Sequence, residues 1–130
     1  MNAELFIRGA VTCGEFVFQE NIFVGKAVDE VADWCESCDW IGVHMTPSAE
    51  LYCSQQPGKP WVKYGLIPLK NGAWSEGLCV DWTSNWKNRA SEIQKIKGTF
   101  LNMSPITQNI SGKFKNTLIF IEKMGMKHGV

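Results

Sequence analysis

The stretch over residues 5–47 decides the fold, and it reads LFIRGAVTCGEFVFQENIFVGKAVDEVADWCESCDWIGVHMTP. It opens with short apolar runs that glycines separate. This pattern predicts a strand over residues 5–8, a turn over 12–14 and a returning strand over 16–18. The first half of the stretch is therefore expected to form a strand hairpin.

A helix and a further strand complete the stretch. From Gly25 onward, apolar residues recur at the spacing of one helix face, with Asp29 and Asp33 on the other side. This spacing predicts an amphipathic helix that opens at Gly25 and ends near Cys38. The apolar run over residues 40–43, bounded by turn formers, predicts a short buried strand. The stretch thus forms a β-β-α-β unit, and the rest of the chain is expected to pack against it.

The remaining residues supply more strands and helices. Turn formers at residues 70–72 predict a hairpin of two strands, over residues 61–69 and 78–80. Capping residues, two of them followed by proline, predict three helices, which begin at Thr46-Pro47, at Thr83 or Ser84, and at Ser104-Pro105. The last helix is expected to stop near Gly125.

The predicted fold class is α+β. A small, mostly antiparallel sheet of about four or five strands carries helices on one face, and two helices end the chain. The β-β-α-β unit makes the expected architecture partly ferredoxin-like. A chain of 130 residues has the length of one ordinary domain. Residues 1–130 are therefore expected to form a single domain.

Composition and charge exclude several classes of function. Thirteen basic and thirteen acidic residues cancel, and no run of Lys or Arg creates a local field, so a nucleic-acid partner is not expected. The apolar residues are too interrupted for a membrane span. The first ten residues lack the pattern of a signal peptide, which favours a cytoplasmic protein. Five cysteines are then expected to be reduced thiols rather than disulfides.

The runs RGAVTCGE (residues 8–15) and DWIGVHMTPSAE (39–50), with the helix start at Gly25, together resemble a known family. They are similar to the second half of the class III nucleotide cyclase catalytic domain, which includes a bacterial pyrimidine cyclase branch. In that family an Arg-Gly strand pairs with its neighbour, and a glycine opens a helix beside the nucleotide. The resemblance covers the first half of the chain and is loose beyond Trp61.

The chain also departs from the family's pattern in two places. The two metal-binding aspartates of the family lie upstream of the Arg-Gly strand, and only seven residues precede Arg8 here. The family's Asn-x-x-x-Arg pair, which places the ribose, falls on Asp29 and Asp33. Acidic residues at these positions would repel a triphosphate. The resemblance therefore implies a partial domain without cyclase activity, without catalytic residues, metal ligands or a cofactor.

Several residues are nevertheless candidates for binding a small ligand. A lone arginine in an apolar strand needs an acidic or anionic partner, and aromatic side chains with a lysine suit a small cationic or apolar compound. The candidate ligand-binding residues are Arg8, Gly25, Asp29, Asp33, His44, Tyr64, Lys70 and Trp74. The alternative without ligand binding is that Asp29 and Asp33 belong to a solvated acidic helix face and that His44 has a structural role. The pair Cys35-x-x-Cys38 closes a helix rather than opening one, so a structural role is favoured over a redox role.

Three functions remain open. The first is a non-catalytic homodimer derived from the cyclase fold that binds a protein or small-molecule partner, because a partial domain leaves sheet edges and apolar surface to cover. The second is a cyclase subunit or fragment that needs a partner chain for the missing carboxylates. The third is an unrelated α+β domain that binds a small ligand.

Overall fold

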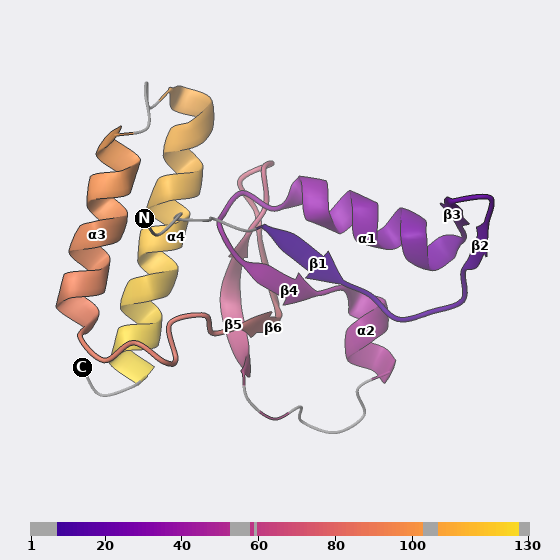
Figure 1. The fold of residues 1–130 in the computed structure, drawn as a ribbon, viewed down its shortest axis with the longest axis horizontal. Coiled ribbons are helices and arrows are strands. Elements are labelled where there is room, and N and C mark those ends of the chain that lie inside the picture. Colours follow the sequence, from indigo (N-terminus) through magenta and orange to yellow (C-terminus); the bar gives the residue numbers. More distant parts are fainter. Residues whose placement is uncertain (1–7, 53–57, 59, 103–106, 128–130) are drawn as a thin grey trace.

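The computed structural model describes residues 8–52, 58, 60–102 and 107–127, and these contain six strands and four helices. Four strands form the main sheet, in the order β1 (Gly9–Val11), β4 (Val43–Met45), β6 (Trp74–Val80) and β5 (Trp61–Pro68). Strands β1 and β4 run parallel, and the other two pairings are antiparallel. The predicted α+β class with a mostly antiparallel sheet is therefore confirmed (Figure 1).

The predicted first hairpin is wrong. The strand β1 does not pair with residues 16–18 but with β4, because the helix α1 (Lys26–Ser37) carries the chain back in a parallel crossover. The hairpin instead joins β2 (Val17–Gln19) to β3 (Ile22–Val24), which form a separate two-stranded sheet. Residues 5–7 lie outside the described residues.

The turn of the observed hairpin explains this register. Glu20 and Asn21 both have positive φ values, 52° and 64°. Two consecutive residues of this kind form the tight turn that matches the twist of a two-stranded hairpin, and Asn tolerates the conformation well. The turn therefore lies between β2 and β3, and not at residues 12–14.

The strand predicted over residues 40–43 lies later, at Val43–Met45. Trp40 is 1% exposed and turns into the core instead of extending along the sheet. The backbone N–H of Ile41 donates to Thr117 Oγ1 at 2.9 Å rather than to a neighbouring strand. The next helix, α2 (Pro47–Tyr52), begins as predicted, because Thr46 Oγ1 accepts a hydrogen bond from the Ala49 N–H at 3.3 Å.

Helices cover one face of the main sheet, as expected. His44 lies opposite Cys79, and Cys79 opposite Val62, so these side chains share a face with Tyr64. On this face Trp34 of α1 contacts the His44 ring at 5.9 Å between centroids. Helix α4 (Gln108–Lys127) covers the other end of the same face, where the ring centroids of Phe120 and Tyr64 are 5.1 Å apart.

The core lies between α4 and this sheet face. Trp40 stacks on Tyr64 at 5.6 Å, and Phe120 meets both rings edge-on. A second cluster lies between α4 and α3 (Arg89–Asn102), where Phe100 and Phe114 stack at 4.1 Å. None of the described helices has an apolar run long enough to span a bilayer.

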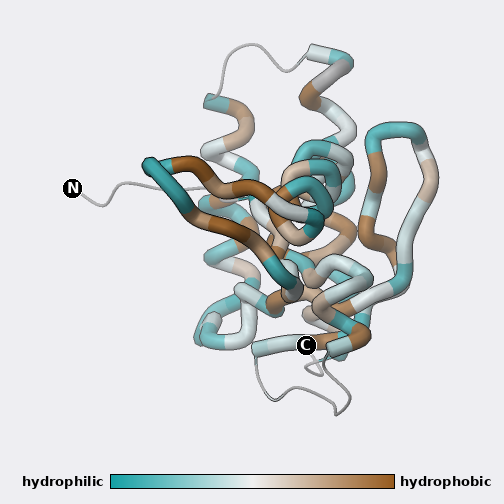
Figure 2. Tube along the Cα trace, turned by 90° about the vertical axis from the view of Figure 1, so that its right-hand side faces the viewer, coloured by the Kyte–Doolittle hydropathy of each residue, from teal (hydrophilic) through white to brown (hydrophobic). Residues whose placement is uncertain are grey.

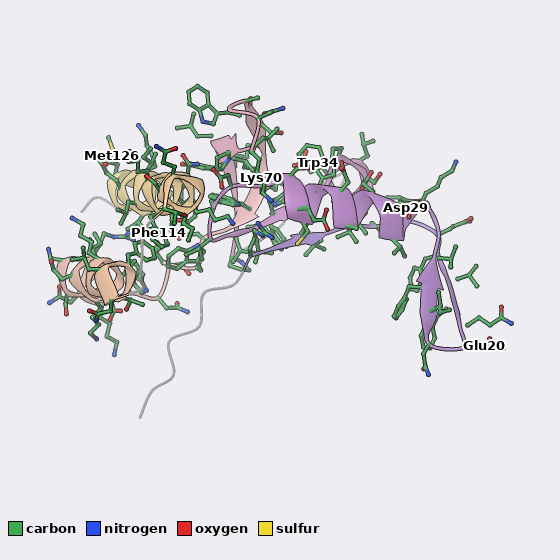
Figure 3. The ribbon with its side chains drawn as sticks, turned by 90° about the horizontal axis from the view of Figure 1, so that it is seen from above. Glu20, Asp29, Trp34, Lys70, Phe114 and Met126 are labelled. Atoms are coloured by element: carbon green, nitrogen blue, oxygen red, sulfur yellow. The ribbon has the colours of Figure 1, made fainter. Side chains whose placement is uncertain are left out.

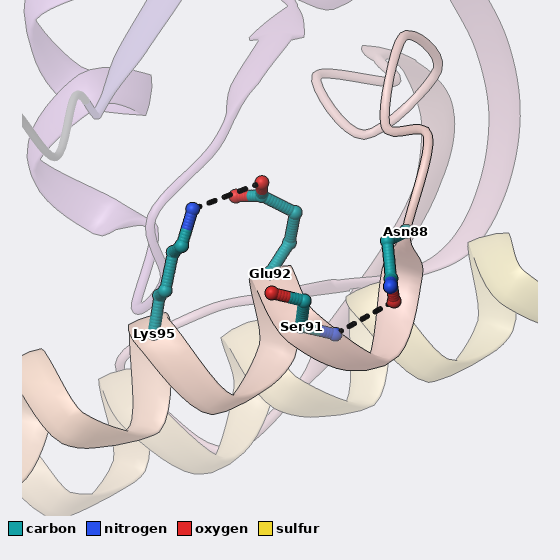
Figure 4. A network of polar contacts seen from close by, with 4 residues as sticks. All are labelled: Asn88, Ser91, Glu92 and Lys95. Atoms are coloured by element: carbon teal, nitrogen blue, oxygen red, sulfur yellow. Dashed lines mark hydrogen bonds and ion pairs between the residues drawn. The ribbon is translucent and has the colours of Figure 1, made fainter.

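The start of α3 differs from the prediction. Asn88, rather than Thr83 or Ser84, caps the helix, because its side-chain oxygen accepts the Ser91 N–H at 3.0 Å (Figure 4). Thr83 is buried and donates to Asp81 at 2.6 Å. The predicted start of the last helix at Ser104-Pro105 lies outside the described residues, and α4 continues past Gly125 to Lys127.

We expect that Gly42→Ala destabilises the fold. A Cβ atom at position 42 would lie 2.6 Å from the Trp40 ring, and this ring is fixed by Tyr64 and Phe120. Overpacking of this kind costs about 1–3 kcal/mol, measured as the free energy of unfolding in urea. The matched control is Gly65→Ala, whose Cβ meets nothing within 4 Å. Equal stability of the two variants would contradict this packing.

Candidate functional site

The most distinctive surface is the hairpin of residues 16–24, hereafter the arm. It projects from the far end of α1, away from the main sheet (Figures 1 and 3). Both of its strands are apolar, as the brown tube in Figure 2 shows. Six apolar side chains of the arm are 55–59% exposed, namely Phe16, Val17, Phe18, Ile22, Phe23 and Val24.

The two faces of the arm differ in composition, because one is aromatic and the other aliphatic. Phe18 lies opposite Phe23, and their rings are 4.5 Å apart, while Phe16 and Phe23 are 5.8 Å apart. These three rings form an aromatic face, and Val17, Ile22 and Val24 lie on the opposite face. An isolated two-stranded hairpin is only marginally stable in water. An arm with two exposed apolar faces is therefore typical of a surface that another protein chain covers.

A cleft of about 920 Å³ lies at the base of the arm. Its walls come from the arm, the start of α1 and the helix α2, and they include Phe16, Gly25, Glu30 and Tyr52. Gly25 joins the arm to α1 with φ of 143°. A Cβ atom there would lie 2.9 Å from the Glu15 carbonyl oxygen, so only glycine fits this junction.

Hydroxyl groups gather around the Glu30 carboxylate beside this cleft. Thr12 and Thr46 directly follow the parallel strands β1 and β4, so they meet at one edge of the sheet, where Thr46 Oγ1 donates to Thr12 Oγ1 at 3.0 Å. Thr12 Oγ1 donates to Glu30 at 2.8 Å and Ser48 Oγ at 2.5 Å. Hydrogen bonds, the largest from Ser48, lower the pKa of Glu30. Glu30 therefore ties α1 to the ends of both parallel strands.

The hydrogen bonds of Glu30 predict a pH dependence of stability. A carboxyl whose pKa is lower in the folded than in the unfolded state stabilises the fold above its unfolded pKa, and this stabilisation is lost as the pH falls. In Glu30→Gln we expect a loss of up to about 1 kcal/mol at pH 7, limited by solvent screening, and a flatter decline of stability below about pH 4.5. Urea unfolding between pH 3 and 7 measures both. The control Asp29→Asn removes the neighbouring exposed carboxylate, and an identical flattening there would refute the assignment to Glu30.

The structure does not bring the predicted ligand-binding residues together. Gly25 lies at the arm cleft, and Asp29 is exposed on α1. Asp33 and Lys70 line a second cleft of about 480 Å³ beside Trp34. Figure 3 shows Lys70 and Trp34 near each other, far from the arm tip at Glu20.

The predicted aromatic pocket is wrong in its composition. Tyr64 is 6% exposed and stacks on Trp40 in the core, where burial raises its pKa to about 12. Trp74 is instead 66% exposed at the start of β6. Tyr64 therefore holds the core together and does not form a wall beside Lys70 and Trp74.

Arg8 and His44 lie near the end of α1. Arg8 Nη1 donates to the Cys38 carbonyl oxygen at 3.4 Å. His44 is 1% exposed, its ring lies 3.6 Å from Cys38 Sγ, and burial lowers the pKa of its imidazole. Burial raises the pKa of Cys38 to about 11. Burial of the Cys38 thiol disfavours a redox role for this residue, and a structural role for the Cys35-x-x-Cys38 pair stays a prediction.

Sequence reasoning missed Glu30, its hydroxyl partners and the arm. The signal for the arm was present, because apolar residues on both sides of Gln19-Glu20-Asn21 leave neither hairpin face polar. Within the described part of the chain, no three His, Cys, Asp or Glu side chains come together as metal ligands. Comparison of the chain with protein-family models, with curated proteins and with solved structures finds no match. The resemblance to nucleotide cyclases therefore stays a prediction from the residues.

Proposed function

We propose that this protein is a non-catalytic interaction module that acts as a homodimer, and that the arm makes the dimer contact. The observation that carries this proposal is the exposure of all six apolar side chains of the arm. Charged tips and polar faces normally protect a free hairpin from association. Within the arm such charge occurs only at Glu20 in the turn, and Glu15 directly precedes the arm.

The size of the exposed surface supports a second copy as the partner. Phenylalanine side chains offer about 150–250 Å² each, so the three that are more than half exposed leave about 300 Å² on the arm, and Val17, Ile22 and Val24 on the opposite face add aliphatic surface. A stable interface buries about 800 Å² on each partner. Two arms with adjoining surface reach this size, and a homodimer covers both arms at once.

The chemistry of α1 supports a non-catalytic role. Asp29 and Asp33 stand where the cyclase-like pattern has its Asn and Arg, and both carboxylates are exposed on α1. Two carboxylates on this helix disfavour the binding of a triphosphate, because like charges repel. The purified chain with Mg²⁺ or Mn²⁺ and each of the four common ribonucleoside triphosphates is therefore expected to form no cyclic nucleotide. Metal-dependent turnover that survives repurification would overturn this half of the proposal.

Hydrogen exchange tests the arm contact directly. At high protein concentration the backbone amides of residues 17–24 are expected to exchange slowly, because the contact covers the hairpin. Dilution into the concentration range of the monomer should speed the exchange of these arm amides. The exchange rates of the amides of β5 and β6 should stay unchanged. Fast exchange of the arm at every concentration would contradict the proposal, since an uncovered two-stranded hairpin opens readily.

A further inference from the structure

The two terminal helices form an apolar groove with a basic rim. The groove lies between the end of α3 and the first half of α4 and has a volume of about 320 Å³. Its apolar wall includes the stacked rings of Phe100 and Phe114, and Leu101 beside them is 78% exposed. Lys97 and Lys115, both exposed, line its rim. We call this surface the helical groove.

The chain is electrically asymmetric, although its formal net charge is zero. Residues 8–52 contain eight acidic and two basic side chains, a formal charge of −6. The helices α3 and α4 contain seven basic and two acidic side chains, a formal charge of +5. Figure 1 places these regions apart along the longest axis, with the arm at one end and the two helices at the other. The field of one copy therefore favours an antiparallel approach of a second copy.

We propose that the arm of one copy docks in the helical groove of a second copy, an inference that rests on the proposed homodimer. The aromatic face of the arm, formed by Phe16, Phe18 and Phe23, matches a groove walled by phenyl and leucyl side chains. The exposed carboxylates Glu15 and Glu20 border this face. They complement the lysines on the groove rim.

The positions of arm and groove require two copies. Because they lie at opposite ends of the molecule, an arm does not reach the groove of its own chain (Figures 1 and 3). Two copies side by side in opposite directions bring each arm to the other's helices, so one two-fold dimer satisfies both contacts and leaves no free end for further growth. One aromatic arm face offers about 300 Å² and covers a similar area of the groove, so each contact buries about 600 Å² and the two reciprocal contacts bury about 1,200 Å² in total, the lower bound of a stable interface.

Charge reversal tests this docking without touching the core. The groove variant carries Lys97→Glu and Lys115→Glu, and the arm variant carries Glu15→Lys and Glu20→Lys. Each variant alone is expected to raise the dissociation constant of the dimer at least about tenfold, because attraction becomes repulsion at both contacts. The chain with all four substitutions should dimerise within about threefold of the wild type, as measured by sedimentation equilibrium.

A control separates charge from position. The variant Lys63→Glu with Lys87→Glu makes the same change in net charge at exposed positions outside the groove and outside α3 and α4, and it is expected to dimerise like the wild type. If the groove variant also dimerises like the wild type, the arm binds elsewhere and this inference is wrong. The inference is equally wrong if the chain with all four substitutions does not recover the dimer affinity of the wild type. That result leaves the proposed homodimer standing, whereas a monomeric wild-type chain would remove the proposed function itself.

Discussion

Replacing Phe18 and Phe23 with serine is expected to convert the protein from a dimer to a monomer at about 20 µM. The two rings lie 4.5 Å apart on the aromatic face of the arm, and each is more than half exposed. Truncating an aromatic contact residue costs about 1 kcal/mol or more, so losing the four rings that the two arms contribute costs about 4 kcal/mol and raises the dissociation constant about a thousandfold. Light scattering on the purified variant measures the mass.

The control for this prediction removes equally exposed apolar surface elsewhere. Leu51 on α2 and Met126 on α4 are 84% and 66% exposed and line neither the cleft at the base of the arm nor the helical groove, and Leu51→Ser with Met126→Ser is expected to leave the dimer intact. The free energy of unfolding of the arm variant in urea should equal that of the wild-type monomer, because the arm adds little to the core. A dimeric arm variant with wild-type affinity would show that the arm is not the contact.

The largest effect on stability is expected for Phe120→Ala. This ring is fully buried and contacts Trp40, Tyr64 and Trp82, at centroid distances of 5.2, 5.1 and 6.0 Å. Through these contacts it joins α4 to the sheet face. Truncation of a buried phenylalanine costs about 3–5 kcal/mol, a large part of the stability of a domain of this size.

The neighbouring residue provides the control for Phe120. Ile119 is 41% exposed on the outer side of α4, and Ile119→Ala is expected to cost less than about 1 kcal/mol. Urea denaturation, followed by tryptophan fluorescence, compares the two variants. A cost for Phe120→Ala no larger than for Ile119→Ala would contradict the packing of α4 on the sheet.

The parts of the fold that follow local rules could be predicted from the sequence. Gly25 and the helix after it, the Thr46-Pro47 helix start and the β5–β6 hairpin each follow from glycine, capping or alternation signals. The α+β class follows from their order. These features depend on residues close together in the chain, so periodicity and capping decide them.

The errors come from contacts between distant residues. The pairing of β1 with β4 joins residues separated by the arm and α1, and a short strand such as Gly9–Val11 does not reveal its partner. Trp40 leaves the sheet because Tyr64 and Phe120 provide its packing partners. Local pattern does not contain this information.

The candidate site shows the same division. The expected acidic stripe on α1 exists as an exposed face, but Glu30, between Asp29 and Asp33, is the carboxylate that the structure uses. Its partners follow two strands whose adjacency the sequence does not reveal. The arm was predictable in composition but not in its separation from the main sheet.

The mass of the wild-type chain in solution tests the central claim most directly. The chain has a mass of 14.6 kDa, and light scattering across concentrations from about 1 to 100 µM is expected to show a dimer of twice that mass that dissociates on dilution. The dissociation constant should increase with added salt, because charged ends of opposite sign face each other. A mass of 14.6 kDa at every concentration would contradict the account, because the apolar arm would then have no second copy to cover it.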